Sequence, residues 1–290
     1  MSSDEFTLRD RQRQFQPDEI GYWSEVKLDI IRKYASAYTA ILSRQTAIRG
    51  FSYIDAFAGA GVHISKDTGE PVQGSPLNAL AVRPPFGHHY FIDLDSAKVD
   101  ELKAVLGGRK DVTLWQGDCN RVLLEEVFPK VKFEDYQRAL CLLDPYGLHL
   151  SWDVIQSAGR MKSVEVFLNF PVMDMNMNVL WHRPDKVDPE QVARMTRYWG
   201  DESWRDSVYR PAPDLFSPDR VEKVDDANRA VALAFRARLK TEAGFAFVPE
   251  PIAMRNNKGA TVYYLFFAAQ RPVAAKIVGD IFCKYADRPF

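Results

Sequence analysis

Carboxylates stand within or directly after several short apolar segments in the first half of the chain. They are Asp55, Asp93, Asp95, Asp118 and Asp144, each beside a run of β-branched, aliphatic or aromatic residues. An ionised carboxylate only accepts hydrogen bonds, so it suits ribose hydroxyls or the N–H groups of an amine. Because ligands of open α/β sheets bind outside the carboxyl ends of the strands, we expect these side chains to surround one ligand site.

A glycine turn follows the first of these segments. The stretch Tyr53–Phe57 runs into Ala58-Gly59-Ala60-Gly61, and glycine permits positive φ and a close approach of the backbone to a ligand. The full GxGxxG pattern and the P-loop pattern GxxxxGK[ST] are both absent, which disfavours a nicotinamide-dependent oxidoreductase and a P-loop nucleotide site. We predict that Asp55, Phe57, Gly59 and Gly61 belong to a cofactor site.

The second and third segments end in groups that suit a nucleoside. Asp93 and Asp95 could accept hydrogen bonds from ribose hydroxyls. Asp118 could accept from the amino group of adenine, and we place its neighbour Cys119 in the same cofactor site. Each aspartate has a second interpretation, because Asp is also a preferred N-cap of a following helix. Both interpretations stay open at this point.

The fourth segment ends in Asp144-Pro145-Tyr146-Gly147. Asp144 could accept one N–H of an exocyclic amine, the carbonyl of Pro145 could accept the other, and Tyr146 could stack on a planar base. Holding both N–H groups would aim the nitrogen lone pair at an electrophile, which is catalysis by positioning. The alternative is a tight turn, since Asp, Pro and Gly all favour turns.

The elements that must position these residues alternate in type, which predicts a parallel sheet with helices on both faces. A long amphipathic helix is expected first, over Tyr22–Leu42. The expected strands are Phe51–Phe57, His89–Ile92, Val112–Trp115, Ala139–Leu143 and Glu165–Phe170, and the expected helices between them are Pro76–Val82, Ser96–Leu106, Asn120–Phe128 and Trp152–Ala158.

The pattern changes after Phe170. We expect a partly helical insertion over about 171–225, in which Met173 to Met177 form a lid or pack in the core, and then a helix over Asp225–Ala243. Two strands, Phe245–Ile252 and Thr261–Ala268, are predicted to close the chain. The domain division is an N-terminal arm and helix (1–45) followed by one domain (46–290).

Composition limits the class of protein. The 290 residues are 46% hydrophobic and 27% charged, with 38 Lys and Arg against 39 Asp and Glu, as in a globular protein with no global field for nucleic acid. Three cysteines and the absence of CxxC predict free thiols and no metal site.

No apolar run approaches the ~20 residues of a membrane span, so we expect no membrane contact and a cytoplasmic protein. Arg9, Arg11 and Arg13 could help to bind phosphate.

Taken in order, the motifs carry a resemblance. The chain contains YIDAFAGAG, FIDLD, GDCN, CLLDPYGLHLSW and VFLNFP, together with GSPLNAL, VYYLFFAAQ and a helix that reads W-x-x-x-KLDII. In this it resembles class I S-adenosylmethionine-dependent methyltransferases and, within them, the three-Cys-motif partner protein family. The DPYG stretch is also similar to the DPFG of tRNA guanine N2-methyltransferases and the DPPY of adenine N6-methyltransferases.

The resemblance implies an α/β fold with a Rossmann-like, mostly parallel seven-stranded sheet, an antiparallel terminal strand, an N-terminal helical extension and an insertion after the fifth strand. It implies that Gly59 and Gly61 face the methionine part of S-adenosylmethionine, Asp93 the ribose and Asp118 the adenine. Asp144, Pro145 and Tyr146 would hold the acceptor. The implied partner is a radical-SAM-type protein with a three-cysteine motif.

Two functions remain open on the sequence. One is methyl transfer to an exocyclic amine of a nucleobase in DNA or RNA. The other is a non-catalytic partner or scaffold that uses the methyltransferase fold to dock on the three-cysteine-motif protein. A basic rim around the DPYG stretch would favour the first, because nucleic acid is bound largely through its phosphates.

Overall fold

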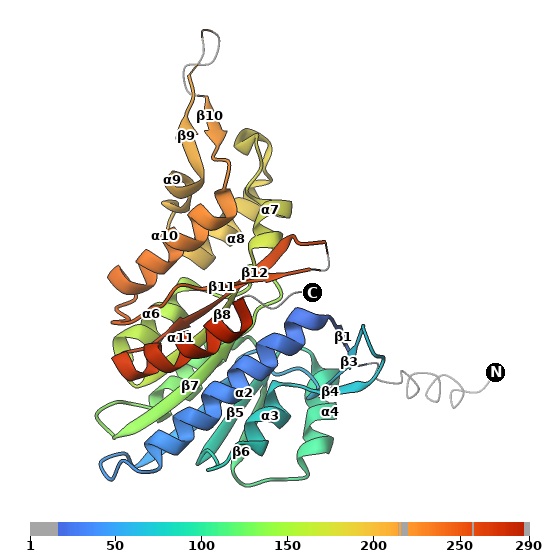
Figure 1. The fold of residues 1–290 in the computed structure, drawn as a ribbon, viewed down its shortest axis with the longest axis vertical. Coiled ribbons are helices and arrows are strands. Elements are labelled where there is room, and N and C mark those ends of the chain that lie inside the picture. Colours follow the sequence, from blue (N-terminus) through green and yellow to red (C-terminus); the bar gives the residue numbers. More distant parts are fainter. Residues whose placement is uncertain (1–16, 214, 216–219, 257, 287–290) are drawn as a thin grey trace, which may run out of the picture.

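A seven-stranded sheet forms the centre of the protein (Figure 1). The computed structural model describes residues 17–213, 215, 220–256 and 258–286, so Arg9, Arg11 and Arg13 lie outside the described residues. The strand order is β11–β12–β8–β7–β2–β5–β6. The strands are β2 (Gly50–Asp55), β5 (His88–Asp93), β6 (Val112–Gln116), β7 (Gln137–Leu143), β8 (Val164–Phe170), β11 (Ile252–Arg255) and β12 (Thr261–Ala268).

Strand direction identifies the fold. Strands β6, β5, β2, β7 and β8 are parallel, whereas β12 is antiparallel to both β8 and β11. When the seven strands of this sheet are numbered by their order along the chain, the spatial order from β6 to β11 is 3-2-1-4-5-7-6. This is the topology of class I methyltransferases. The predicted α/β fold class with an antiparallel terminal strand is therefore confirmed.

Side chains alternate between the two faces of the sheet and build one apolar core on each. Ile54 and Cys141 belong to one core, and their neighbours Tyr53 and Leu140 belong to the other. The core that contains Ile54 is covered by α5 (Cys119–Val122), α6 (Trp152–Met161) and α10 (Ala227–Thr241). The core that contains Tyr53 is covered by α2 (Tyr22–Leu42), α3 (Ser75–Ala81), α4 (Ser96–Leu106) and α11 (Pro272–Ala286).

Helix α2 has the bounds that the sequence predicts. Trp23, Ile30, Ile31, Tyr34 and Tyr38 form its buried stripe, which packs against the sheet beside α11 (Figure 1). The helix thus covers one face of the sheet and reaches from the carboxyl ends of the strands toward their amino ends. The division of the chain at residue 45 stays a prediction.

Three expectations about secondary structure were wrong. The strand expected over Phe245–Ile252 is replaced by β11, which begins only at Ile252. Phe245 and Val248 are buried in the core, but they lie in a loop that has one isolated bridge, between Phe247 and Ala269. Helix α11, which the sequence analysis omitted, follows β12. The region 120–128 forms α5, a π-helical turn and a 3₁₀ turn instead of one helix.

The predicted insertion is partly helical, as expected. It contains α7 (Val172–Asn178), a 3₁₀ turn (Pro184–Lys186), α8 (Pro189–Trp199), α9 (Trp204–Val208) and the hairpin β9 (Tyr209–Pro211) with β10 (Val221–Lys223). The methionine stretch divides: Met175 is fully buried, whereas Met173 and Met177 line the pocket described below, and Met177 is 67% exposed. Within the described residues, no helix is long and apolar enough to cross a membrane.

A second, three-stranded sheet is built largely from the segment between the glycine turn and α3. It consists of β1 (Glu19–Ile20), β3 (Val62–Ser65) and β4 (Pro71–Gln73). Strands β3 and β4 form a hairpin, and β1 pairs parallel to β3. Helix α3 then begins at Ser75 with Gly74 as its N-cap. This sheet brings the residues before α2 over the carboxyl ends of the central strands.

Candidate functional site

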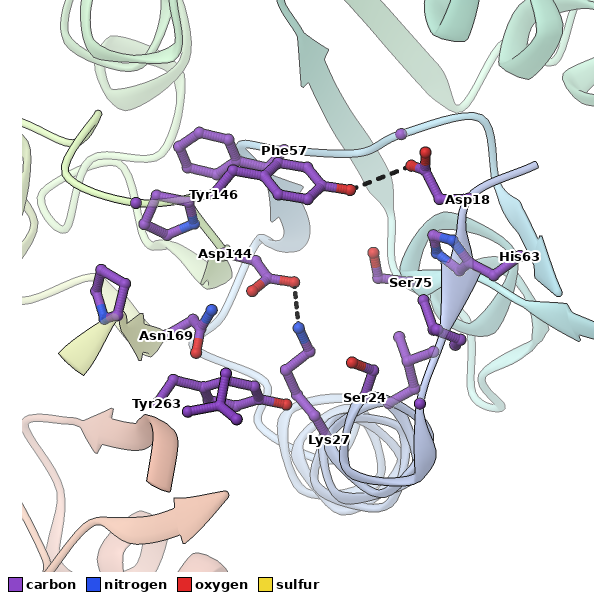
Figure 2. Close-up of a pocket in the computed structure, with 18 of the residues that line it drawn as sticks. Asp18, Ser24, Lys27, Phe57, His63, Ser75, Asp144, Tyr146, Asn169 and Tyr263 are labelled. Atoms are coloured by element: carbon purple, nitrogen blue, oxygen red, sulfur yellow. Dashed lines mark hydrogen bonds and ion pairs between the residues drawn. The ribbon is translucent and has the colours of Figure 1, made fainter. Parts of the chain in front are cut away.

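A pocket of about 480 Å³ lies at the carboxyl ends of β2, β7 and β8, under the segment that contains β1 (Figure 2). Volumes of this size are typical of small-molecule sites. Six of the predicted site residues line it: Phe57, Gly59, Asp93, Asp144, Pro145 and Tyr146.

The other predicted residues lie behind or beside the pocket wall. Asp95 caps α4 by accepting the N–H of Ala97 at 2.9 Å, and Asp118 caps α5 by accepting the N–H of Asn120 at 2.7 Å. Both aspartates therefore have the capping role that the sequence left open. Cys119 is buried in the core, and burial raises the pKa of its thiol to about 12.

Asp55 ends β2 inside the protein, with no exposed surface. Its Oδ1 accepts the N–H of Phe57 at 3.3 Å, which helps to shape the turn after the strand. Burial raises the pKa of Asp55 to about 7, and the carboxylates of Asp144 and Asp93 add to that increase. Asp55 is thus a titratable group behind the wall of the pocket.

The two glycines of the turn have different structural roles. Gly59 has φ +63°, and a Cβ built on it would meet no atom within 4 Å. Gly61 has φ +85°, and its Cβ would lie 2.9 Å from Cδ1 of Leu102 on α4. Gly59 therefore leaves open space in the pocket wall, whereas Gly61 allows α4 to pack against the turn.

Asp93 fixes the glycine turn from the neighbouring strand. Its Oδ2 accepts the N–H of Gly59 at 2.7 Å, and its Oδ1 accepts the N–H of Asp95 at 2.9 Å. Each carboxylate oxygen has a further lone pair. Asp93 can therefore shape the turn and still accept hydrogen bonds from a ligand in the pocket.

Asp144 has a partner that the sequence analysis missed. Nζ of Lys27, near the start of α2, lies 2.5 Å from Oδ2 of Asp144 (Figure 2), and the lysine side chain is only 9% exposed. Burial opposes its charge, but Asp144 together with Tyr263 and Tyr146 raises the pKa of Lys27 above its usual value. Lys27 lies four residues after Trp23 and four before Ile31, on the apolar stripe of the helix. A lysine in this position was the signal in the sequence that it has a buried partner.

The segment before α2 is held over the pocket by a second ion pair. Asp18 accepts hydrogen bonds from Nζ of Lys98 at 2.5 Å and from the hydroxyl of Tyr146 at 3.1 Å. Burial alone would raise the pKa of Asp18, but Lys98 and the hydroxyl of Tyr146 lower it below its ordinary value. Lys98 also lies 5.3 Å from the centre of the Tyr146 ring, so one face of the ring that was expected to stack on a base contacts a cation.

Asn169 and Asp174 complete the pocket on the side of the insertion. Asn169 ends β8 and is 8% exposed, and its Oδ1 has no hydrogen-bond partner among the described residues. Asp174 on α7 lies against Gly147, where an added Cβ would come within 3.2 Å of the carboxylate. The sequence contained the NFP stretch at the end of β8 but did not show that its asparagine lines the same pocket as Asp144.

Comparisons with known proteins add a general likeness. No family model matches the chain, and no curated protein matches it. Protein LPL1258 from Legionella pneumophila is 12% identical, with a TM-score of 0.49 over 90% of this chain and 92% of that one. A SAM-dependent methyltransferase from Leishmania major is 8% identical, with a TM-score of 0.35 over 85% and 82% of the two chains. The class of fold rests on the strand order described above.

Proposed function

We propose that the protein is an S-adenosylmethionine-dependent methyltransferase that acts on an exocyclic amine. The observation that supports this most directly is the strand order, which gathers Gly59, Asp93 and Asp144 around one pocket at the carboxyl ends of the parallel strands. Ligands of open α/β sheets bind in this position.

The pocket wall fits the cofactor at two points. The open space at Gly59 leaves room for an extended chain beside the turn, and Asp93 has lone pairs left for ribose hydroxyls. When bound, the cofactor supplies a methyl group that its sulfonium already activates. The protein must therefore align the acceptor and exclude water, and it needs no strong base for this.

Asp144 is the residue that we assign to the acceptor. Its Oδ2 is held by Lys27, which restricts the rotation of the carboxylate. Oδ1 has no partner among the described residues and can accept an N–H from the acceptor amine. The DPYG motif supports a nucleobase as the carrier of that amine, and the motif order supports a three-cysteine-motif radical-SAM-type protein as partner.

The cofactor site can be tested with a matched pair of glycine variants. Gly59 and Gly69 both have positive φ and open space around a built Cβ, but only Gly59 lines the pocket. Each Ala variant should lose about 1 kcal/mol of stability from backbone strain. Gly59→Ala should also bind S-adenosylmethionine at least ~tenfold more weakly in calorimetry, whereas Gly69→Ala should bind normally. If the wild-type protein does not bind the cofactor at tens of micromolar, the proposal fails.

The acceptor can be tested by transfer from labelled cofactor to DNA, total RNA and a purified three-cysteine-motif protein in parallel. Asp144→Asn should slow transfer by on the order of 100-fold, because the amine loses its positioning acceptor, and it should leave cofactor affinity nearly unchanged. Unchanged transfer by this variant would contradict the role of Asp144.

A second candidate function is a non-catalytic partner of the three-cysteine-motif protein. Two observations favour it. Five carboxylates but only three lysines line the pocket, so the described lining forms no basic rim for nucleic acid, and Lys27 already binds one oxygen of Asp144. Tight binding to the partner without cofactor binding or transfer would support this function.

A further inference from the structure

A second pocket, of about 460 Å³, lies at the opposite end of the sheet. It is formed by the amino ends of β7 and β8, the last turns of α2 with the loop that follows, and the start of α11. The first pocket lies at the carboxyl ends of the same strands. The second pocket is therefore separate from the proposed methyl-transfer site.

Two buried hydroxyl groups in the lining of this pocket have no hydrogen-bond partner among the described residues. They are the phenol of Tyr38, in a residue 6% exposed, and Oγ of Ser163, in a residue 2% exposed. A buried polar group without a partner costs about 1–3 kcal/mol. Both residues line the same cavity, and a polar ligand bound there would supply the missing hydrogen-bond partners.

The pocket also has an excess of positive charge. Arg138, Lys162 and Arg271 line it, and none of the three forms a salt bridge within the part of the chain that the structure describes. The first turn of α11 also lines it through Val273 and Ala274, and the N-terminus of a helix favours anions.

One acidic residue faces these cations. The carboxyl group of Glu165 accepts the hydroxyl of Tyr34 at 2.5 Å, and burial raises its pKa to about 7. A carboxyl group that is partly protonated near neutral pH opposes an anion only weakly. Much of the remaining wall is apolar, with Ile41, Leu42, Ile48 and Ile277, although Gln45 and Gln270 also line it.

We propose that this second pocket binds a small amphipathic oxyanion, a carboxylate or a phosphate monoester on an apolar body. The oxyanion lies near Arg271, Lys162 and the start of α11 and accepts the hydroxyls of Tyr38 and Ser163. The apolar body contacts the isoleucines and leucine from α2, the loop after it and α11. Carboxylates and phosphate esters share this chemistry, and the experiment separates them.

The probes are hexanoate, phenyl phosphate and the neutral hexan-1-ol, titrated into the ¹⁵N-labelled protein. At least one anion should shift the amide signals around Ser163 and Arg271 but not those around Gly59 and Asp144. It should bind at least ~tenfold more tightly than hexan-1-ol, as expected for a charge-assisted contact. Preference for hexanoate or phenyl phosphate identifies the head group. Equal binding of hexan-1-ol, or no shift in the second pocket at millimolar probe, overturns the proposal.

Variants locate the site. Arg271 is exposed, so Arg271→Gln should fold normally and weaken anion binding about tenfold, whereas Lys284→Gln, an exposed change at the other end of α11, should not. Ser163→Ala removes an unpartnered hydroxyl and should weaken binding several-fold without loss of stability. Unchanged anion affinity in both Arg271→Gln and Ser163→Ala contradicts the placement.

Discussion

The two ends of the central sheet differ in whether their polar and charged groups have partners, although α2 contributes to both. At the carboxyl ends, Lys27 pairs with Asp144, and Lys98 pairs with Asp18. At the amino ends, the hydroxyls of Tyr38 and Ser163 have no partner among the described residues, and the cations beside them form no salt bridge there.

The difference shows which pocket is organised before a ligand arrives. Paired charges restrain each other, so the first pocket has its geometry in the protein alone, as a site that works by positioning requires. Unpartnered buried groups destabilise the protein until something satisfies them. The second pocket therefore gains the most from an occupant, and the predictions below change one end of the sheet at a time.

The largest effect is expected from breaking the pair of Lys27 and Asp144. Lys27→Met leaves the Asp144 carboxylate without its partner and should lower the free energy of unfolding by about 3 kcal/mol. The double variant Lys27→Met/Asp144→Leu should recover most of that loss, because both charges are removed together. Urea denaturation measures the free energy of unfolding of the wild type, the single variant and the double variant. A single variant as stable as the wild type would show that the first pocket is not organised by this pair.

An intermediate effect is expected from pH at the amino ends of the strands. The pKa of Glu165 is raised from an ordinary value of 4.5 to about 7, so between these values the folded protein binds more protons than the unfolded chain. Its contribution to stability is complete below about pH 4.5 and is lost as pH rises through 7. Between pH 5.5 and pH 8 this loss is about 2 kcal/mol. Tyr34, Tyr38, Arg138, Lys162 and Arg271 are the titratable or charged groups that line the pocket with it.

Glu165→Gln should remove this part of the pH dependence, measured as unfolding free energy at pH 5.5 and 8. The pKa of Asp55 is also raised to about 7, so about half of the dependence should remain until Asp55→Asn is added. Glu101→Gln, an exposed change on α4, is the control. If Glu165→Gln and Glu101→Gln gave the same pH profile, Glu165 would not titrate in this range.

The smallest effect is expected from the ion pair over the first pocket. Asp18 is 38% exposed in its side chain, so solvent screens the pair, and Asp18→Asn should cost only about 0.5 kcal/mol. The pKa of Asp18 is lowered from 3.8, so its contribution is present above that pH and is lost as pH falls through the folded value. Thermal denaturation should show a smaller difference between the variant and the wild type at pH 3 than at pH 7. A loss of several kcal/mol would mean that the segment before α2 is part of the core.

Local signals predicted much of the fold and part of the site. Alternating apolar strands and helices lie within short windows, so the bounds of α2 and the succession of strands and helices along the chain followed from spacing. The same windows could not separate two roles of an aspartate. Asp95 and Asp118 cap helices, and Asp93 lies in the pocket, although all three follow similar strands. Apolar residues recur at helical spacing after Pro272, so the sequence also contained a local signal for α11.

By itself, the sequence determined the alternating α/β architecture, the glycine turn and the line of carboxylates at the strand ends, because each depends on residues that are neighbours along the chain. Only the tertiary structure decided that Lys27 meets Asp144 across 117 positions, that Asp18 closes over Tyr146, and that a second pocket lies at the amino ends of β7 and β8. The physical reason is that these contacts depend on strand order and on the face of the sheet that α2 covers, and neither is encoded in the spacing of adjacent residues.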